Sequence, residues 1–186
     1  MTFQEQLQSL RACDEAAGWV GDRDMATAWA ECKRGDWLLW LAARAGVDRR
    51  LVTIAACACA RTALVHVPAG ELRPLQAIEA AEAWTRGEAS IDDVRSAAYA
   101  AYAAYAAYAA TYSDHASASA SASASYAANA AAYSDHASAS SAAYASAAYA
   151  AYTASYAAYA RTASLGACAD IVRGFITAEV VGKAMS

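Results

Sequence analysis

The chain has 186 residues, which is enough for one domain or for a compact head with an extension. Its net charge of −4 gives no support to non-specific binding of nucleic acid, and no apolar run reaches the roughly 18 to 20 residues of a membrane span. The N-terminal residues have neither a basic start nor an apolar signal core, so we expect a cytoplasmic protein without a membrane or nucleic-acid partner.

Residues 1–95 predict a helical head of four or five short helices, because side chains suited to helix ends punctuate them. Helix starts are expected at Thr2, at Asp24 or Gly21, and at Gly35, Asp48, Pro74 and Ser90, and helix ends at Gly46, Pro68 and Gly87. The longest of these helices is expected to run from residue 49 to about residue 67. Its spacing predicts a buried face made of Leu51, Ile54, Ala55, Ala58, Thr62 and Val65.

All five tryptophans lie in this head, and at helical spacing we expect them in the core rather than stacked on a ligand. They are Trp19, Trp29, Trp37, Trp40 and Trp84. The cysteines are odd in number and scattered over helix-like segments, which does not suggest a disulfide framework. We expect small buried thiols in a reducing compartment at Cys13, Cys32, Cys57, Cys59 and Cys168.

Between Gly87 and Gly166 the chain runs 78 residues without glycine or proline. Residues 97–160 comprise 33 Ala, 12 Tyr, 12 Ser and seven other residues, with no bulky aliphatic side chain, Lys or Arg. Alanine is the strongest helix former, so this composition predicts helix, and tyrosine must supply the large contacts. Ala and Ser alternate over 116–125 with the period of a strand, but both are poor strand residues, and we expect helix there too.

The same region contains an internal repeat. Residues 112–119 and 133–140 share the sequence Tyr-Ser-Asp-His-Ala-Ser-Ala-Ser at an offset of 21 residues. One straight helix over 97–160 would be about 95 Å long, which is too long for a compact body of this size. We therefore expect antiparallel segments of about 20 residues that break at the Ser-Asp steps (113–114 and 134–135), with Asn129 as a third candidate turn.

Tyrosine spacing distinguishes two sets on these helices. Tyr99, Tyr102, Tyr105 and Tyr108 step by three residues and therefore sweep around half of a helix, which predicts that they are partly exposed or shared between neighbours. The set at 149, 152, 156 and 159 follows 3-4-3 spacing and predicts a packing seam. The first set is the candidate for partner binding, because tyrosine supplies rigid area and a hydroxyl group.

The Ser-Asp-His triplets invite two chemical interpretations. Adjacent residues on a helix diverge by about 100°, so Ser113, Asp114 and His115 cannot form a catalytic relay among themselves. We expect no catalytic residue, no enzyme activity and no cofactor. A zinc site formed by Asp114, His115, Asp135 and His136 is the less favoured alternative to capping aspartates beside exposed histidines.

Four stretches carry a family resemblance. Residues 34–50 read RGDWLLWLAARAGVDRR, residues 55–61 read AACACAR before HVPAGE at 66–71, residues 77–84 read AIEAAEAW before RGEA at 86–89, and residues 168–173 read CADIVR. Over about 30–175 the chain resembles a bacterial immunity-protein family, named as like immunity protein five of polymorphic toxin systems. The resemblance implies neutralisation of a cognate toxin and brings no catalytic motif. Where that family often has scattered Asp or Glu in its middle segments, this chain has mostly Ser.

We expect an all-α protein in which a Trp-bearing helical head continues into stacked antiparallel Ala/Tyr-rich helices. The expected divisions are a head at 1–95, an Ala/Tyr/Ser-rich region at 96–165 packed on it, and a C-terminal helix and tail at 166–186, all in one structural domain. The expected function is non-enzymatic binding that occludes a cognate toxin. The alternative is a structural or self-assembling protein, with ice or surface binding as a minor variant. The oligomeric state stays open.

Overall fold

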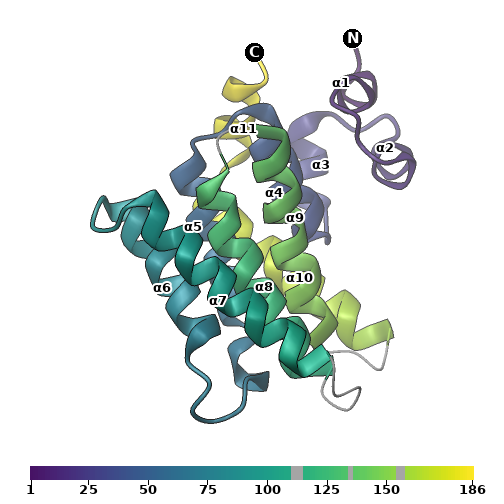
Figure 1. Ribbon diagram of the computed structural model, residues 1–186. Coiled ribbons are helices and arrows are strands. Elements are labelled where there is room, and N and C mark those ends of the chain that lie inside the picture. The colour runs from purple at the N-terminus through teal and green to yellow at the C-terminus, as the bar shows by residue number, and fades with distance from the viewer. Residues whose placement is uncertain (110–114, 134–135, 154–157) are drawn as a thin grey trace.

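The structure is a computed structural model that describes residues 1–109, 115–133, 136–153 and 158–186 (Figure 1). Within those ranges the regular elements are all helices, without a strand. The all-α fold class expected from the sequence is therefore confirmed. The Ala/Ser alternation over 116–125 is helical as well, as expected.

The head contains six α-helices and a 3-10 turn. They are α1 (Phe3–Ser9), α2 (Asp14–Val20), α3 (Met25–Glu31), α4 (Gly35–Ala45), α5 (Arg49–Arg61), η1 (Leu64–His66) and α6 (Arg73–Arg86). Thr2 and Glu5 form a capping box at the start of α1, and the Asp24 carboxylate accepts from the Thr27 backbone N–H at the start of α3. Gly46 ends α4 in the left-handed conformation that favours glycine, with φ of 91°. These expected ends are confirmed.

Helix α2 was not predicted from the sequence, and α5 is shorter than predicted. Cys13 precedes α2 without a capping hydrogen bond from its side chain, so no recognisable start marks this helix. Helix α5 ends at Arg61 rather than near residue 67, because Thr62 is its C-cap and the Thr62 hydroxyl donates to the Cys59 carbonyl at 2.7 Å. The chain then turns into η1.

The Ala/Tyr-rich region forms helices of 18 or 19 residues that fold back on one another. They are α7 (Ile91–Ala109), α8 (His115–Ala132) and α9 (His136–Thr153), followed by α10 (Ala158–Phe175) and α11 (Ala178–Ala184). Helices α8 and α9 begin at His115 and His136, and the Ser-Asp steps expected as breaks (113–114 and 134–135) lie outside the described residues. Asn129 lies inside α8 and so does not mark a turn, contrary to expectation.

Helix α8 occupies the centre of the fold. It packs against α7 and α9 from its own region and against α5 and α6 from the head (Figure 1). Residues 120–125, an alternation of Ala and Ser, are all buried. Small side chains permit this because they let helix backbones approach closely from several directions. The Ala/Ser segment is therefore part of the core rather than an outer layer on the head.

Buried serines tie these closely packed helices together. The Ser125 hydroxyl donates to the Ala98 carbonyl of α7 at 3.0 Å, and the Ser123 hydroxyl donates to the Ser146 carbonyl of α9 at 2.8 Å. The Ser146 hydroxyl in turn donates to the Ala56 carbonyl of α5 at 3.1 Å. Each bond satisfies a polar atom that would otherwise be costly to bury. Together they connect α7, α8, α9 and α5.

The face of α5 that is buried differs from the face expected from the sequence. Of the six residues expected on its buried face, Ala55 alone is fully buried, and Val65, beyond the helix end, is 82% exposed. The side that packs into the core carries Val52, Thr53, Ala55, Ala56, Cys57, Cys59 and Ala60. Helices α6, α8, α9 and α10 all pack on α5, so its small residues and Val52 face neighbours, whereas Leu51 and Ile54 are half-buried.

Candidate functional site

Exposed tyrosines mark the candidate binding surface on α7. Tyr99 and Tyr102 expose 77% and 49% of their surface, and Tyr105 is half-buried. Three-residue spacing turns successive side chains by about 60° around a helix, so these tyrosines pass from solvent toward the neighbouring helices. The expected partial exposure is confirmed for these three. The side chain of Tyr108 lies outside the described residues.

Four tyrosine rings form a continuous chain across three helices, which we call the tyrosine cluster: Tyr102 and Tyr105 on α7, Tyr126 on α8 and Tyr149 on α9. The centroids of the Tyr102 and Tyr105 rings lie 5.4 Å apart, and those of Tyr105 and Tyr149 lie 6.5 Å apart, edge to face. Tyr149 stacks on Tyr126 at 5.4 Å with an interplanar angle of 17°. These separations fall in the favourable range for aromatic pairs, so the cluster fixes its own side chains.

The Tyr126 phenol of the cluster stays protonated at physiological pH. Burial raises the pKa of the Tyr126 phenol, and the phenols of Tyr149, Tyr102 and Tyr105 raise it further because ionised phenols would repel one another. A protonated phenol both donates and accepts a hydrogen bond. The cluster therefore offers aromatic area with polar atoms and no charge.

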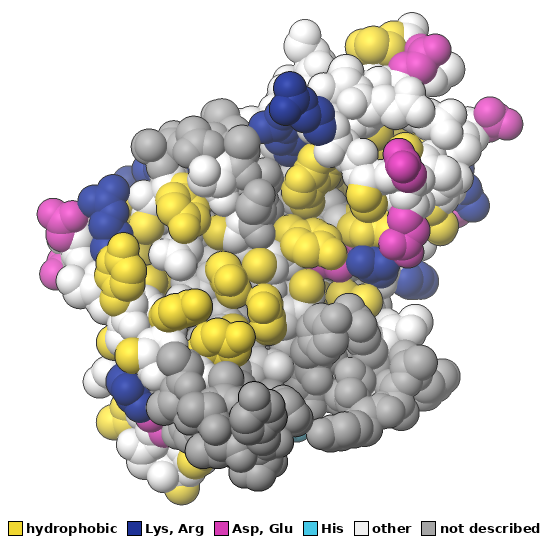
Figure 2. Space-filling view, turned by 45° about the vertical axis from the view of Figure 1, so that its right-hand side comes forward, with side chains coloured by type: hydrophobic (Ala, Val, Ile, Leu, Met, Phe, Trp, Pro, Cys, Tyr) yellow, Lys and Arg dark blue, Asp and Glu magenta, His cyan; other side chains and the backbone are white. Residues whose placement is uncertain are grey.

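The surroundings of the cluster are also poor in charge. Residues 97–160 contain no Lys, Arg or Glu. Figure 2 shows hydrophobic side chains, the class in which tyrosine is drawn, gathered over the middle of one face, with charged side chains toward its edges. Tyr133 and Tyr144 add two further exposed rings from α9 and the turn before it. An uncharged aromatic patch with a charged rim is typical of a protein-binding surface.

Several residues singled out by the sequence have side chains outside the described part of the chain. They are Asp114, His115, Asp135 and His136 of the proposed zinc site and the tyrosines at 152, 156 and 159 of the proposed seam. The backbone still constrains the zinc site, because His115 begins α8 and His136 begins the next helix. A helix of 18 residues is about 27 Å long, which argues against one ion shared by both repeats. Among described residues, no group of three metal-ligating side chains comes together.

An aromatic cavity that the sequence did not predict lies between the N-terminal helices and α3, α4 and α9. Its volume is about 330 Å³, and four of the five tryptophans line it: Trp19, Trp29, Trp37 and Trp40. Trp29 is fully buried, as expected, whereas the other three are half-buried because one side of each faces this space. The only available signal was that these tryptophans cluster within residues 19–40.

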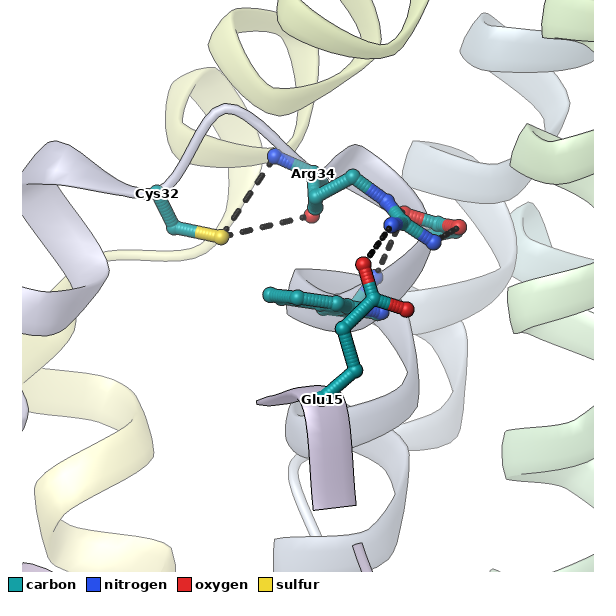
Figure 3. A network of polar contacts seen from close by, with 5 residues as sticks. Glu15, Cys32 and Arg34 are labelled. Carbon is teal, nitrogen blue, oxygen red and sulfur yellow. Dashed lines mark hydrogen bonds and ion pairs between the residues drawn. The ribbon is translucent and has the colours of Figure 1, made fainter. Parts of the chain in front are cut away.

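A polar network lies next to Cys32 and Trp37, two of the residues that line the cavity (Figure 3). The Arg34 guanidinium binds both oxygens of the buried Asp36 carboxylate, at 2.9 and 2.7 Å, and reaches Glu15 of α2 at 3.3 Å. The hydrogen bond to Asp36 raises the pKa of Arg34, so its charge is permanent. Arg34 also lies 4.3 Å from the centroid of the Trp37 ring. The network therefore links α2 to α4.

The cysteines divide into one exposed and four buried thiols, none in a disulfide. Burial raises the pKa of Cys32 and Cys57, and a hydrogen bond to Cys168 together with burial raises that of Cys59. These thiols are therefore inert, as expected. Cys13 is exposed, which corrects the expectation that all five are buried: it lies in the turn between α1 and α2, where no element covers it.

No family model, curated protein or solved structure matches this chain. Among the described residues, no helix is both long and apolar enough to span a membrane.

Proposed function

We propose that this protein binds another protein through the tyrosine surface of α7, α8 and α9. The observation that carries the proposal is the pairing of exposed rings, Tyr99 and Tyr102, with a fixed cluster that extends across three helices. Tyrosine has few rotatable bonds, so it contributes contact area at a low entropic cost. The partner side would need aromatic or aliphatic side chains and hydrogen-bonding groups rather than a complementary charge.

Because the chain resembles immunity proteins, we propose that its partner is a toxin of the producing cell. The protein would act without chemistry, by covering the part of the toxin that meets its target. A preformed helical surface suits this role, because little ordering is required on binding and dissociation is correspondingly slow. The proposed site of action is the cytoplasm, where the toxin would be met before it acts on its own producer.

Co-expression tests the proposal directly. The product of the neighbouring gene is expressed with the wild-type chain or with a Tyr99→Ala/Tyr102→Ala variant, and growth and co-purification are measured. Both rings are exposed and alanine is the better helix former, so the variant is expected to fold as well as the wild type. Loss of two central aromatic contacts is expected to weaken binding by at least about 2 kcal/mol, or thirtyfold, and to abolish rescue.

Val65→Ser is the matched control, because Val65 is an exposed apolar residue on η1 and does not belong to the helices that carry the tyrosine surface. It should leave binding and rescue unchanged. If the neighbouring gene product neither binds the wild type nor is neutralised by it, the toxin proposal is refuted. If the double variant binds as tightly as the wild type, the proposed role of the tyrosine surface is refuted.

Self-assembly through the same surface is the second candidate. The near absence of charge over residues 97–160 favours it, since two copies would meet without mutual repulsion. Light scattering as a function of concentration separates the two: a protein that stays monomeric at high concentration is not self-assembling. The ice-binding variant is not supported for the Ala/Ser segment at 120–125, because those side chains are buried.

A further inference from the structure

The cavity described above is a second candidate site: none of the four rings of the tyrosine cluster lines it, and Tyr144 is the one exposed tyrosine among its described lining residues. Its walls are aromatic and aliphatic side chains from α1, α2, α3 and α4, closed on one side by Tyr144 of α9. Exposed residues Arg11 and Cys13 are among those that line it, so the cavity opens to solvent at the turn between α1 and α2. Its volume of about 330 Å³ is within the range of small-molecule sites.

Arg11, at the mouth, has an unfavourable backbone conformation. Its φ is 64°, which makes it the one residue other than glycine with a positive φ in the described chain. The conformation ends α1 in a Schellman turn: the Arg11 N–H donates to the Gln8 carbonyl and the Ala12 N–H to the Leu7 carbonyl, both at 2.9 Å. Glycine is the usual residue at this position because a side chain there is strained. The chain nevertheless has an arginine there.

Two contacts from outside hold this turn in place. The Arg44 guanidinium of α4 donates to the Leu10 carbonyl at 3.1 Å, and the Gln4 amide donates to the Ala17 carbonyl of α2 at 3.0 Å. Strained residues persist where the surrounding structure determines their conformation, and they concentrate at binding sites. The turn therefore fixes the backbone of Arg11 at the rim, where its exposed side chain lines the cavity.

Among the described residues, one charged side chain lines the cavity. It belongs to Arg11, and no described residue forms a hydrogen bond or ion pair with this side chain. Arg34, which does not line the cavity, pairs with both Asp36 and Glu15. Asp14, at the start of α2, does not line the cavity. A ligand therefore meets an apolar interior and one unpaired guanidinium.

We propose that this cavity binds a small monoanionic amphiphile, a carboxylic acid with an apolar body, whose carboxylate pairs with Arg11. Taking about 30 Å³ for each water-sized group, the space holds a molecule of roughly ten non-hydrogen atoms. The tryptophan rings provide the apolar contact, and the guanidinium matches a carboxylate in two parallel hydrogen bonds. The site does not involve Tyr99 or Tyr102, so its test is separate from the test of the proposed partner surface.

Octanoate is the probe, because it has about this size and does not absorb where tryptophan emits. Binding is measured by calorimetry and by tryptophan emission, with octylamine as the control of equal length and opposite charge. A Kd between about 0.1 and 1 mM is expected for octanoate, since ligands this small have limited binding energy. Octylamine should bind at least about tenfold more weakly.

Cys13 reports where the probe binds. It lies on the rim and is the one exposed thiol of the five, so a thiol reagent should modify it first in the folded protein. Saturating octanoate is expected to slow this modification, as measured by mass spectrometry. Binding without protection of Cys13 would place the acid elsewhere and overturn the proposal.

Variants at Arg11 complete the test. Arg11→Gly removes the charge and relieves the backbone strain, so it should raise Tm while weakening octanoate binding about tenfold or more. Arg11→Lys keeps the charge and should keep most of the binding. The Tyr99→Ala/Tyr102→Ala variant should bind octanoate as the wild type does. No saturable octanoate binding, equal affinity for octylamine, or undiminished binding by Arg11→Gly would each refute the site.

Discussion

Two serines on the central helix allow the energetics of the small-residue core to be tested with identical substitutions. Ser121 and Ser123 both lie on α8 with no exposed surface. The Ser123 hydroxyl donates to the Ser146 carbonyl at 2.8 Å, whereas the Ser121 hydroxyl has no hydrogen-bond partner among the residues that the structure describes. Replacing each by alanine removes the same atom from the same helix. The two substitutions should nevertheless change stability in opposite directions.

The magnitudes follow from three contributions. Alanine has a higher helix propensity than serine, which stabilises both variants by about 0.4 kcal/mol. Ser123→Ala also loses a hydrogen bond with a net value of about 1 kcal/mol, so it should destabilise the fold by about 0.5 kcal/mol. Ser121→Ala removes a buried hydroxyl whose desolvation costs about 1 to 2 kcal/mol, so it should stabilise the fold by about 1.5 to 2 kcal/mol.

The free energy of unfolding is measured by urea denaturation and Tm by thermal denaturation, both followed by far-UV circular dichroism, which reports on all helices. The predicted difference of about 2 kcal/mol between the variants corresponds to about 4 to 8 °C in Tm for a chain of this length. Ser125→Ala, which also loses an interhelical bond, should behave like Ser123→Ala. Equal shifts for Ser121→Ala and Ser123→Ala would show that serine bonding does not hold these helices together.

Two further predictions concern close packing and buried thiols. Gly35→Ala should destabilise the fold by about 1 to 3 kcal/mol, because its Cβ would lie 2.5 Å from the Cys168 Cβ and 2.7 Å from the Ala169 backbone nitrogen. Gly166→Ala, whose Cβ would meet no atom within 4 Å, should instead stabilise α10 by about 0.5 to 1 kcal/mol. Equal changes in Tm for the Gly35→Ala and Gly166→Ala variants would disprove the close contact between α4 and α10. The raised pKa values of Cys32, Cys57 and Cys59 mean that these thiols ionise in the unfolded chain before they do in the folded one. The stability that these thiols contribute should therefore be complete below pH about 8.5 and decline above it. The decline should be shallower in Cys57→Ala, which has one buried thiol fewer. Urea midpoints that do not change with alkaline pH would contradict this.

Helix ends could be read from the sequence because capping is local. Thr2, Asp24 and Gly46 act on backbone groups within a few residues, so residue type and spacing were sufficient. The buried face of α5 could not be read in the same way. It depends on α8 and α9, whose small residues accept its small side chains and leave Leu51 and Ile54 half-buried.

The two candidate sites show the same limit. The spacing of Tyr99, Tyr102 and Tyr105 was enough to predict their exposure, since exposure follows the geometry of one helix. The stacking of Tyr126 on Tyr149 depends on the register between α8 and α9, which the buried serines help to set. The aromatic cavity is lined by residues of α1, α2, α3, α4 and α9 and by an arginine in a turn that ordinarily favours glycine. No periodicity within the sequence marks it.

The composition of the Ala/Tyr region separates the residues that hold the fold from those available for binding. Alanine methyl groups and serine hydroxyls fill the space between α5, α7, α8 and α9, where a larger side chain would not fit. Tyrosine is too large for those positions, so its rings collect at the surface and contact one another. Removing an outer ring such as Tyr99 should therefore leave the core intact. Enlarging a buried alanine such as Ala124 should disrupt the core and, with it, the alignment of the helices that carry the rings.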